Sequence, residues 1–369
     1  MTFYLLFLLL ISVSLVLSHL YAKYNAGIQI SLLVLVIAVS GFREYVGEDF
    51  RSYVNWYELK SREFEFGFEL IMDIFRWMHA SYHFLFFFVS FCTISLVFLG
   101  VKKYTVHSNL AFFFFLLIPF LYLHSWSLIR QALAMAIFFY AFHYLITKKY
   151  LIYTILMCIA MSIHITSVIP FILVIAVYVF ADKVKTIHLV IFLCLSLILS
   201  QIHWVSMLSS WFLKTRYSYY FSTDLQSSTL IKMVAVNGLA IIMLFFHKKM
   251  KANYPNQKYF MLLFFTSVII TNIFSSINDL TRFAYYFYIF EIVVFADLVF
   301  LEFKKRRFLI FTGLYLYGIA SFFYSLKVDQ KLNNQKTKYI PYNCIFYKFD
   351  DAFFMMGTDY LVEDPLDVE

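Results

Sequence analysis

The chain has 369 residues, of which 62% are hydrophobic and 14% are charged. Soluble domains are about 45–50% apolar and about 25% charged, so this composition excludes a water-soluble globular protein. The net charge of +8 does not indicate nucleic-acid binding, because the basic residues separate apolar runs instead of forming one basic surface. The four cysteines lie far apart without a CxxC pair, which argues against a zinc site or a disulfide framework.

Apolar runs follow one another along most of the chain, and most are close to the roughly 20 residues that a membrane span needs. No basic residue precedes the first run, so we expect a first span there and not a cleaved signal peptide. We predict an all-α polytopic integral membrane protein, a bundle of about 12 transmembrane helices with functional outer (periplasmic) loops. The runs at 150–164 and 166–181 are short, and form either two spans joined by a tight turn or one bent hairpin. The runs lie at about 3–20, 26–42, 82–99, 108–124, 129–147, 150–164, 166–181, 187–203, 229–247, 258–275, 284–301 and 308–324.

Half of the 30 basic residues fall on alternate connections between the runs, and lysine predominates among them. The positive-inside rule assigns these connections to the cytoplasm and both termini to the outside. We therefore expect one helical bundle over 1–325, with outer loops at about 43–81, 204–228 and 276–284, and a polar outer tail over 326–369. The cytoplasmic basic residues are Lys23, Lys102, Lys103, Lys148, Lys149, Lys183, Lys185, Lys248, Lys249, Lys251, Lys258, Lys304, Lys305, Arg306 and Arg307.

Seven arginines lie on the opposite, outer side, against the usual bias of positive charge. Arginine offers a planar, permanently charged fork that suits phosphate and carboxylate groups. Their accumulation predicts an anionic ligand outside the membrane, and the alternative is a set of loop cations paired with carboxylates. The seven are Arg43, Arg51, Arg62, Arg76, Arg130, Arg216 and Arg282.

Arg130 and Arg282 each fall in the first turn of a helix expected to run from outside to inside. A cation at this positive end of the helix dipole is unfavourable by about 0.3–1 kcal/mol, so helix stability does not explain either residue. An arginine beside free amides makes a phosphate cradle, and two such ends would clamp a pyrophosphate. A structural ion pair with a carboxylate is the alternative. The expected N-caps are Ser125 or Ser127 for the first helix and Asn278 or Asp279 for the second.

The outer segment after the second run combines a carboxylate with aromatic side chains. Glu48 or Asp49 is expected to cap a short helix there. Asp49, Tyr53 and Tyr57 recur every four residues and so share one helix face, with Trp56 close by. This face is a candidate carbohydrate-binding surface, and an N-cap on an interfacial helix is the alternative.

Four further residues have two interpretations each. Arg43 ends a helix, where a cation stabilises the dipole, so a structural role and a ligand role both stay open. Arg216 and Tyr217 lie in an aromatic outer loop that suits a sugar ring, although aromatic residues also line membrane interfaces. His164 lies at the outer end of a short run, either as a general base or as a hydrogen-bonded helix-end residue.

Three segments resemble the EpsG-like, Wzy-type polysaccharide polymerases. They are REYVGEDFRSYVNWYE at 43–58, IRQALAMAIFFYAFHYLITKKYLIYTILMCIAMSIHITSVIP at 129–170 and TRFAYYF at 281–287. The resemblance covers most of 1–325, and the chain departs from it at 161–163, where the family tends to have Ala and an aromatic residue before the histidine. The matching positions are Arg43, Gly47, Asp49, Phe50 and Tyr53; Arg130, Gln131 and Ala134; His164, Thr166 and Ser167; and Arg282 and Phe283.

The resemblance implies a glycosyltransferase that moves a growing glycan from undecaprenyl pyrophosphate to the terminal sugar of an incoming lipid-linked unit. It would act at the outer face of the bacterial inner membrane, in O-antigen, capsule or exopolysaccharide synthesis. We expect no metal and no cofactor, because arginines would neutralise the pyrophosphate. The expected partners are the undecaprenyl-pyrophosphate-linked oligosaccharide, membrane lipid, a flippase and a chain-length regulator, with no nucleic acid. A lipid-linked oligosaccharide flippase and a membrane acyltransferase that modifies the polysaccharide are the alternatives.

The resemblance and the residues together give a hypothesis for each role. Arg130 and Arg282 would bind the donor pyrophosphate and stabilise its charge as it leaves. Asp49 or His164 would take the proton from the attacking hydroxyl. The candidate substrate-binding residues are Arg43, Arg216, Tyr53, Tyr57, Trp56, Tyr217 and Gln131.

Overall fold

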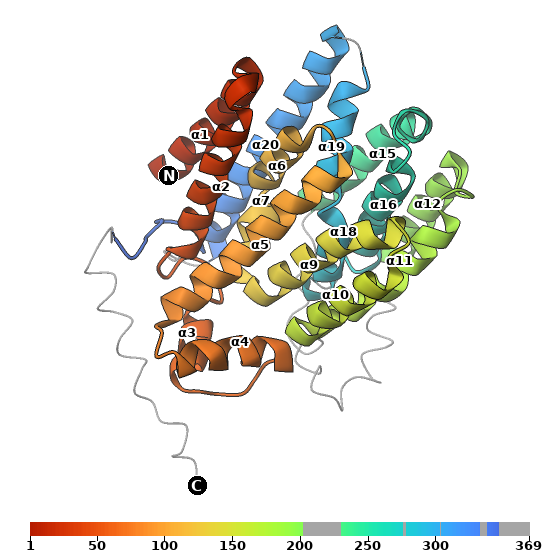
Figure 1. The fold of residues 1–369 in the computed structure, drawn as a ribbon. Helices are drawn as coiled ribbons and strands as arrows, with labels where there is room; N and C mark the ends of the chain where they lie inside the picture. The colour runs from red at the N-terminus through yellow and green to blue at the C-terminus, as the bar shows by residue number, and fades with distance from the viewer. Residues whose placement is uncertain (202–229, 276–277, 303, 333–337, 347–369) are drawn as a thin grey trace.

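The computed structural model describes residues 1–201, 230–275, 278–302, 304–332 and 338–346. Within these ranges the regular elements are helices, which run alongside one another in one bundle (Figure 1). The α-helices are α1 Thr2–Leu20, α2 Asn25–Gly41, α3 Phe50–Glu58, α4 Phe66–Trp77, α5 Tyr82–Tyr104, α6 Ser108–Leu117, α7 Pro119–Tyr122, α8 His124–Ser127, α9 Ile129–Ile146, α10 Tyr150–Ile163, α11 Val168–Phe180, α12 Thr186–Gln201, α15 Leu230–Asn253, α16 Gln257–Ile273, α17 Asn278–Thr281, α18 Tyr285–Tyr288, α19 Glu291–Phe300 and α20 Lys304–Leu332. The short 3₁₀ turns are η1 Ala22–Tyr24, η2 Ile165–Ser167 and η3 Arg282–Ala284.

In the described residues, seven helical segments are long and apolar enough to cross a membrane, or eight if one bent pair counts as a single span. The chain is therefore a multi-pass membrane protein by helix composition. Each of the twelve predicted runs contains helix, but twelve full-length spans are not found among the described residues. The helices at Tyr150–Ile163, Ile165–Phe180, Thr186–Gln201 and Gln257–Ile273 have only 10–17 residues each. Between the two interpretations of 150–181, the structure has two short helices joined through His164 and η2.

The bent pair is α6 with the α7–α8 segment, and the two parts differ in direction by 80°. The cause lies in Pro119, which lacks an amide hydrogen and disfavours helical geometry in the residue before it. Ile118 is accordingly extended, with φ −85° and ψ 111°. The predicted continuous run at 108–124 thus breaks near its middle.

The helices differ in how much protein surrounds them. The spans Ile129–Ile146 and Arg282–Phe300 are the most buried, at 72% and 83% of their windows. The spans containing α1, α2, α15 and α20 are only 22–28% buried, although they are as apolar as the central ones. An apolar helix without protein around it faces lipid, so α9, α18 and α19 form the core and the other four lie at the bundle surface.

The two ends of the bundle carry different residues. At one end, which we call the Lys-rich end, Lys258 binds Asp182 at 2.8 Å, Lys251 donates to the carbonyl of Ala181 at 2.9 Å, and Lys249 pairs with Glu302. These lysines belong to the connections that the sequence assigns to the cytoplasm. At the other end, α3 and α4 lie across the bundle (Figure 1), and we call this the α3–α4 end.

A segment near the C-terminus, 338–346, packs against the loop that follows α2. Its backbone forms an antiparallel bridge between Cys344 and Arg43, with amide hydrogen bonds from Glu44 to Asn343 (2.9 Å) and from Ile345 to Phe42 (3.0 Å). This segment therefore forms part of the α3–α4 end.

Candidate functional site

The loop from Arg43 to Asp49 is held by Arg43 itself. This side chain is 1% exposed, and its guanidinium donates to the carbonyls of Val46 (3.1 Å) and Trp126 (2.9 Å) and to that of Ser40. It also lies over the ring of Phe86, 5.0 Å from the centroid. The donors of Arg43 are thus used within the protein, which favours the structural alternative of the two roles predicted for it.

Gly47 brings this loop against the end of α8, just before α9. Its φ of +110° belongs to the region that favours glycine, and a Cβ there would lie 2.5 Å from the carbonyl oxygen of Trp126. The next amide, of Glu48, donates to the hydroxyl of Ser127 at 2.9 Å. Since Ser127 is used in this way, and Ser125 donates to the Tyr122 carbonyl, the predicted side-chain cap of the Arg130 helix is wrong.

Asp49 is the N-cap residue of α3, as predicted, but its carboxylate makes no capping hydrogen bond. Burial and the nearby Glu48 raise the pKa of Asp49, while Arg282, Lys338 and Arg130 act in the opposite direction. The two arginines predicted to bind phosphate therefore both influence this carboxylate. A carboxylate with a raised pKa is a better proton acceptor than an ordinary one.

Arg130 lies in the first turn of α9, as predicted, and is held by an acid that the sequence analysis missed. Its Nη1 lies 2.5 Å from Glu65 Oε2, its Nε donates to the hydroxyl of Tyr53 at 3.2 Å, and its guanidinium lies 4.1 Å from the centroid of the Phe64 ring. Both partners of the ion pair remain 20% exposed, so the pair is accessible from solution.

Glu65 joins three parts of the chain at this point. It is the N-cap residue of α4, and its Oε1 accepts the amide hydrogen of Ile165 at 3.0 Å and lies 3.3 Å from Nδ1 of His164. Burial raises the pKa of Glu65, but the contacts with His164, Ile165 and Arg130 outweigh burial and hold it at about 2. Glu65 is therefore ionised at neutral pH and fixes His164 close to Arg130.

Arg282 is linked to the start of α9 by a hydrogen bond to its backbone carbonyl. Gln131, the residue after Arg130, is 5% exposed and donates to the carbonyl of Arg282 at 2.8 Å. The start of α9 is thereby linked to η3, at the start of the Arg282–Phe300 span. The predicted cap residues Asn278 and Asp279 begin α17, which ends just before Arg282.

The residues that follow His164 anchor it from the other side. The hydroxyl of Tyr286, at the start of α18, lies 2.9 Å from Thr166 Oγ1 and 3.1 Å from Ser167 Oγ. The His164 segment thus packs on the Arg282–Phe300 span, which begins with Arg282. Thr166 and Ser167 act here as positioning residues.

The predicted aromatic surface is mostly turned into the protein. Tyr53 and Tyr57 are each 4% exposed, and the Tyr57 hydroxyl donates to the Ala80 carbonyl at 2.6 Å, away from Arg130. Trp56 is half-buried against Tyr53 and Phe64. Of this strip, Tyr53 contacts Arg130 and Trp56 is partly exposed. Arg216 and Tyr217 lie outside the described residues.

A cavity of about 520 Å³ lies beside Arg282, between α7, α15, α18 and α20. Its lining includes five aromatic side chains and two basic ones, His124 and Lys232. The Lys232 Nζ lies 3.4 Å from the hydroxyl of Thr281, next to Arg282 in the chain, and the charge of Arg282 acts on His124. Lys232 was missed as a site residue, although a lysine three residues into an apolar helix is a signal. The aromatic residues are Phe120, Tyr285, Tyr288, Tyr317 and Tyr324.

We call Asp49, Glu65, Arg130, His164 and Arg282 the arginine cluster. It provides two permanent cations at helix starts, one carboxylate with a raised pKa, and an adjoining aromatic cavity. In the described part of the chain, no group of three or more His, Cys, Asp or Glu side chains is placed to hold a metal ion.

Comparison with known proteins identifies the family. The model of the EpsG family matches residues 27–344, a range that contains every member of the arginine cluster. No curated protein and no solved structure matches the chain. Membership suggests a polysaccharide-related membrane protein, in agreement with the resemblance found in the sequence. The chain belongs to the EpsG family.

Proposed function

We propose that this protein polymerises lipid-linked oligosaccharide units at the outer face of the bacterial inner membrane. The growing glycan would leave undecaprenyl pyrophosphate and join the terminal sugar of an incoming unit. The observation that carries the proposal is the Gln131–Arg282 bond, because it joins the starts of the two helices that present Arg130 and Arg282 beside Asp49.

The donor pyrophosphate would bind between the two arginines. An arginine has five N–H donors, and among the described residues the bonds of Arg130 use Nη1 and Nε. The Nη2 edge is then available to a phosphate oxygen while Glu65 holds the side chain in place. The aromatic cavity beside Arg282 suits part of the polyprenyl chain, with Lys232 and His124 near the phosphate end.

The reaction requires one proton transfer and one charge to be stabilised. A hydroxyl of the acceptor sugar attacks the anomeric carbon of the donor glycan, and the bond from that carbon to the pyrophosphate oxygen breaks. Asp49 accepts the hydroxyl proton, and the arginines stabilise the extra negative charge on the departing pyrophosphate. His164 is the second candidate for the proton acceptor, although its contact with Glu65 favours a positioning role.

The test is the polysaccharide ladder from a host that lacks the gene. Complementation with wild type should convert a single-repeat band into a ladder, whereas Arg130→Ala and Arg282→Ala should leave one repeat at equal protein level. Arg130→Lys should also be impaired, because lysine lacks the planar fork. Arg62→Ala is the matched control: Arg62 is an exposed arginine of the α3–α4 end that pairs with Asp73 at 2.9 Å, outside the cluster.

Three outcomes would contradict the proposal. A full ladder with Arg130→Ala and Arg282→Ala would remove the arginines from the reaction. Loss of all surface repeat units without the gene would make export the missing step and favour a flippase. A ladder that forms without the gene but lacks an acyl substituent would favour an acyltransferase.

A further inference from the structure

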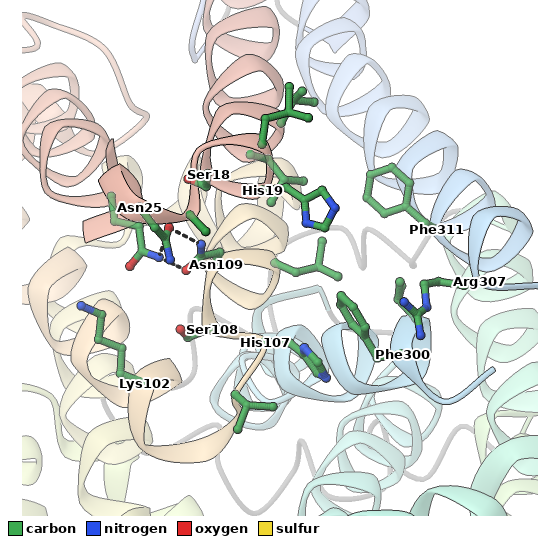
Figure 2. Close-up of a pocket in the computed structure, with 18 of the residues that line it drawn as sticks. Ser18, His19, Asn25, Lys102, His107, Ser108, Asn109, Phe300, Arg307 and Phe311 are labelled. Carbon is green, nitrogen blue, oxygen red and sulfur yellow. Dashed lines mark hydrogen bonds between the residues drawn. The ribbon is translucent and has the colours of Figure 1, made fainter. Parts of the chain in front are cut away.

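A second cavity, of about 910 Å³, opens at the Lys-rich end, opposite the arginine cluster. It lies between the end of α1, the start of α2, the end of α5, the start of α6, the end of α19 and the start of α20 (Figure 2). Since α2 begins at this cavity and ends at the Arg43 loop, the two sites are separated by the length of a span. The cavity is therefore independent of the proposed polymerase activity.

Basic side chains line this cavity without an acidic one among the described residues that form it. Lys102 and Arg307 lie on opposite sides, with His19 and His107 between them (Figure 2). Arg306, which precedes Arg307 in the chain, is not part of the lining and lies 3.7 Å from Glu302. The charge of the cavity thus favours an anion.

Arg307 has an unused donor at this site. Its Nε is buried and has no hydrogen-bond partner among the described residues, while its guanidinium lies over the ring of Phe300 at 4.6 Å from the centroid. A buried donor without an acceptor is unfavourable, and most such groups in proteins are paired with protein, water or ligand. The Arg307 guanidinium thus has donor capacity that the described residues leave unused.

The start of α6 adds to the positive potential. This helix has 10 residues and begins at Ser108, with no side-chain cap from its N-cap residue His107. Ser108 and Asn109 both line the cavity. The first amides of a helix attract anions, so this end acts in the same direction as Lys102 and Arg307.

The remaining walls separate into a neutral polar strip and an apolar surface. Asn25 accepts hydrogen bonds from Gln29 at 2.9 Å and from Asn109 at 2.7 Å, and these three amides bind one another instead of competing for the anion (Figure 2). The apolar part comes from α1 and α20, which are among the least buried spans and so face lipid. Its residues are Leu15, Val16, Leu20, Phe308 and Phe311.

We propose that this cavity binds an anionic phospholipid of the inner leaflet, with its headgroup between Arg307 and Lys102 and its acyl chains along α1 and α20. Basic pockets between transmembrane helices on the cytoplasmic side are sites for anionic lipid headgroups. The acyl chains distinguish this ligand from a free phosphate, because they account for the apolar wall.

The experiment uses the purified full chain, stripped of lipid in detergent, and measures lipid binding by native mass spectrometry and by the shift in Tm. The probes are phosphatidylglycerol, phosphatidylethanolamine of the same acyl chains, and glycerol phosphate. We expect phosphatidylglycerol to bind at least tenfold more tightly than phosphatidylethanolamine, and glycerol phosphate to leave Tm unchanged at the same concentration. In the double variant Lys102→Gln/Arg307→Gln, phosphatidylglycerol binding should fall at least tenfold.

The matched control is Lys103→Gln/Arg306→Gln, which removes the same charges from neighbouring positions outside the cavity and should change binding less than twofold. Equal binding of the two lipids to the wild type overturns the proposal without any variant. Equal loss in the two double variants would mean that net charge alone attracts the lipid, and would overturn the site. A Tm shift with glycerol phosphate as large as that with the lipid would assign the cavity to a free phosphate ester.

Discussion

Replacing Glu65 by Gln tests whether the charge of this carboxylate holds the arginine cluster together. The substitution keeps the shape of the side chain but removes the charge that binds Arg130, His164 and the amide of Ile165. Because these three groups belong to α9, to the end of α10 and to η2, we expect the variant to lose stability as well as activity.

The size of the effect follows from the pKa of Glu65, which falls from 4.5 to about 2. At about 1.36 kcal/mol for each pH unit, this corresponds to an upper value of about 3 kcal/mol. Hydrogen bonds to charged groups contribute about 1.5–3 kcal/mol each, which is the same range. We therefore expect Glu65→Gln to lower the free energy of unfolding by about 2 kcal/mol at pH 7.

The stabilisation that Glu65 provides should decrease at low pH. A carboxyl whose pKa is lower in the folded state contributes its full stabilisation above pH 4.5, and loses it as the pH falls towards 2. Glutamine does not titrate, so the difference between wild type and variant should shrink between pH 4.5 and 2.

The assay is unfolding in detergent, followed by tryptophan fluorescence at several pH values for wild type, Glu65→Gln and the control Glu58→Gln. Glu58 is an exposed residue of α3, so its replacement should change stability by less than about 0.5 kcal/mol. If Glu65→Gln matches the control at pH 7, or if its effect does not depend on pH, the ion pair does not hold the cluster together.

Three further predictions concern the same end of the bundle. Asp49→Asn should leave the protein level unchanged and abolish the ladder. In an in vitro transfer assay, wild-type activity should fall as the pH drops through the raised pKa of Asp49, because a base must be deprotonated to act. Gln131→Leu should destabilise the protein by about 1 kcal/mol, because it removes the hydrogen bond that links the Arg282 segment to α9. Ladder intensity should fall more than the protein level measured by immunoblot. Gly47→Ala should lower the amount of folded protein through the clash with Trp126, whereas Gly27→Ala, with open space around it, should be neutral in a thermal unfolding assay.

The sequence was sufficient to predict where the helices lie, because hydropathy alone marks the runs that avoid water. It was not sufficient to count spans, since a run of 14 or 16 apolar residues can be a short helix packed against neighbours. The break at Pro119 shows the same limit: proline indicates a bend, but its angle depends on what α6 and α8 pack against.

At the candidate site, too, some residues could be predicted from the sequence and others could not. Arg130 and Arg282 could be identified because a cation at a helix start opposes the dipole and needs another reason to be there. Glu65 could not, because one glutamate among many between α2 and α5 has no local signal, and its three partners come from distant segments. Arg43 and Tyr57 have motif-like positions but bind backbone carbonyls, and only tertiary structure reveals that use.

The bridge between Cys344 and Arg43 can form only late in synthesis, because its two residues lie far apart in the chain. Synthesis delivers the loop after α2 to the membrane early, but the strand that pairs with it emerges only after α20 has been inserted. The amide of Gly47 meets the carbonyl of Lys338 at that late stage as well. A nascent or truncated chain that ends at α20 would therefore insert its helices and still lack the support beside Asp49. The α3–α4 end thus gains these contacts only after every helix from α1 to α20 has been made.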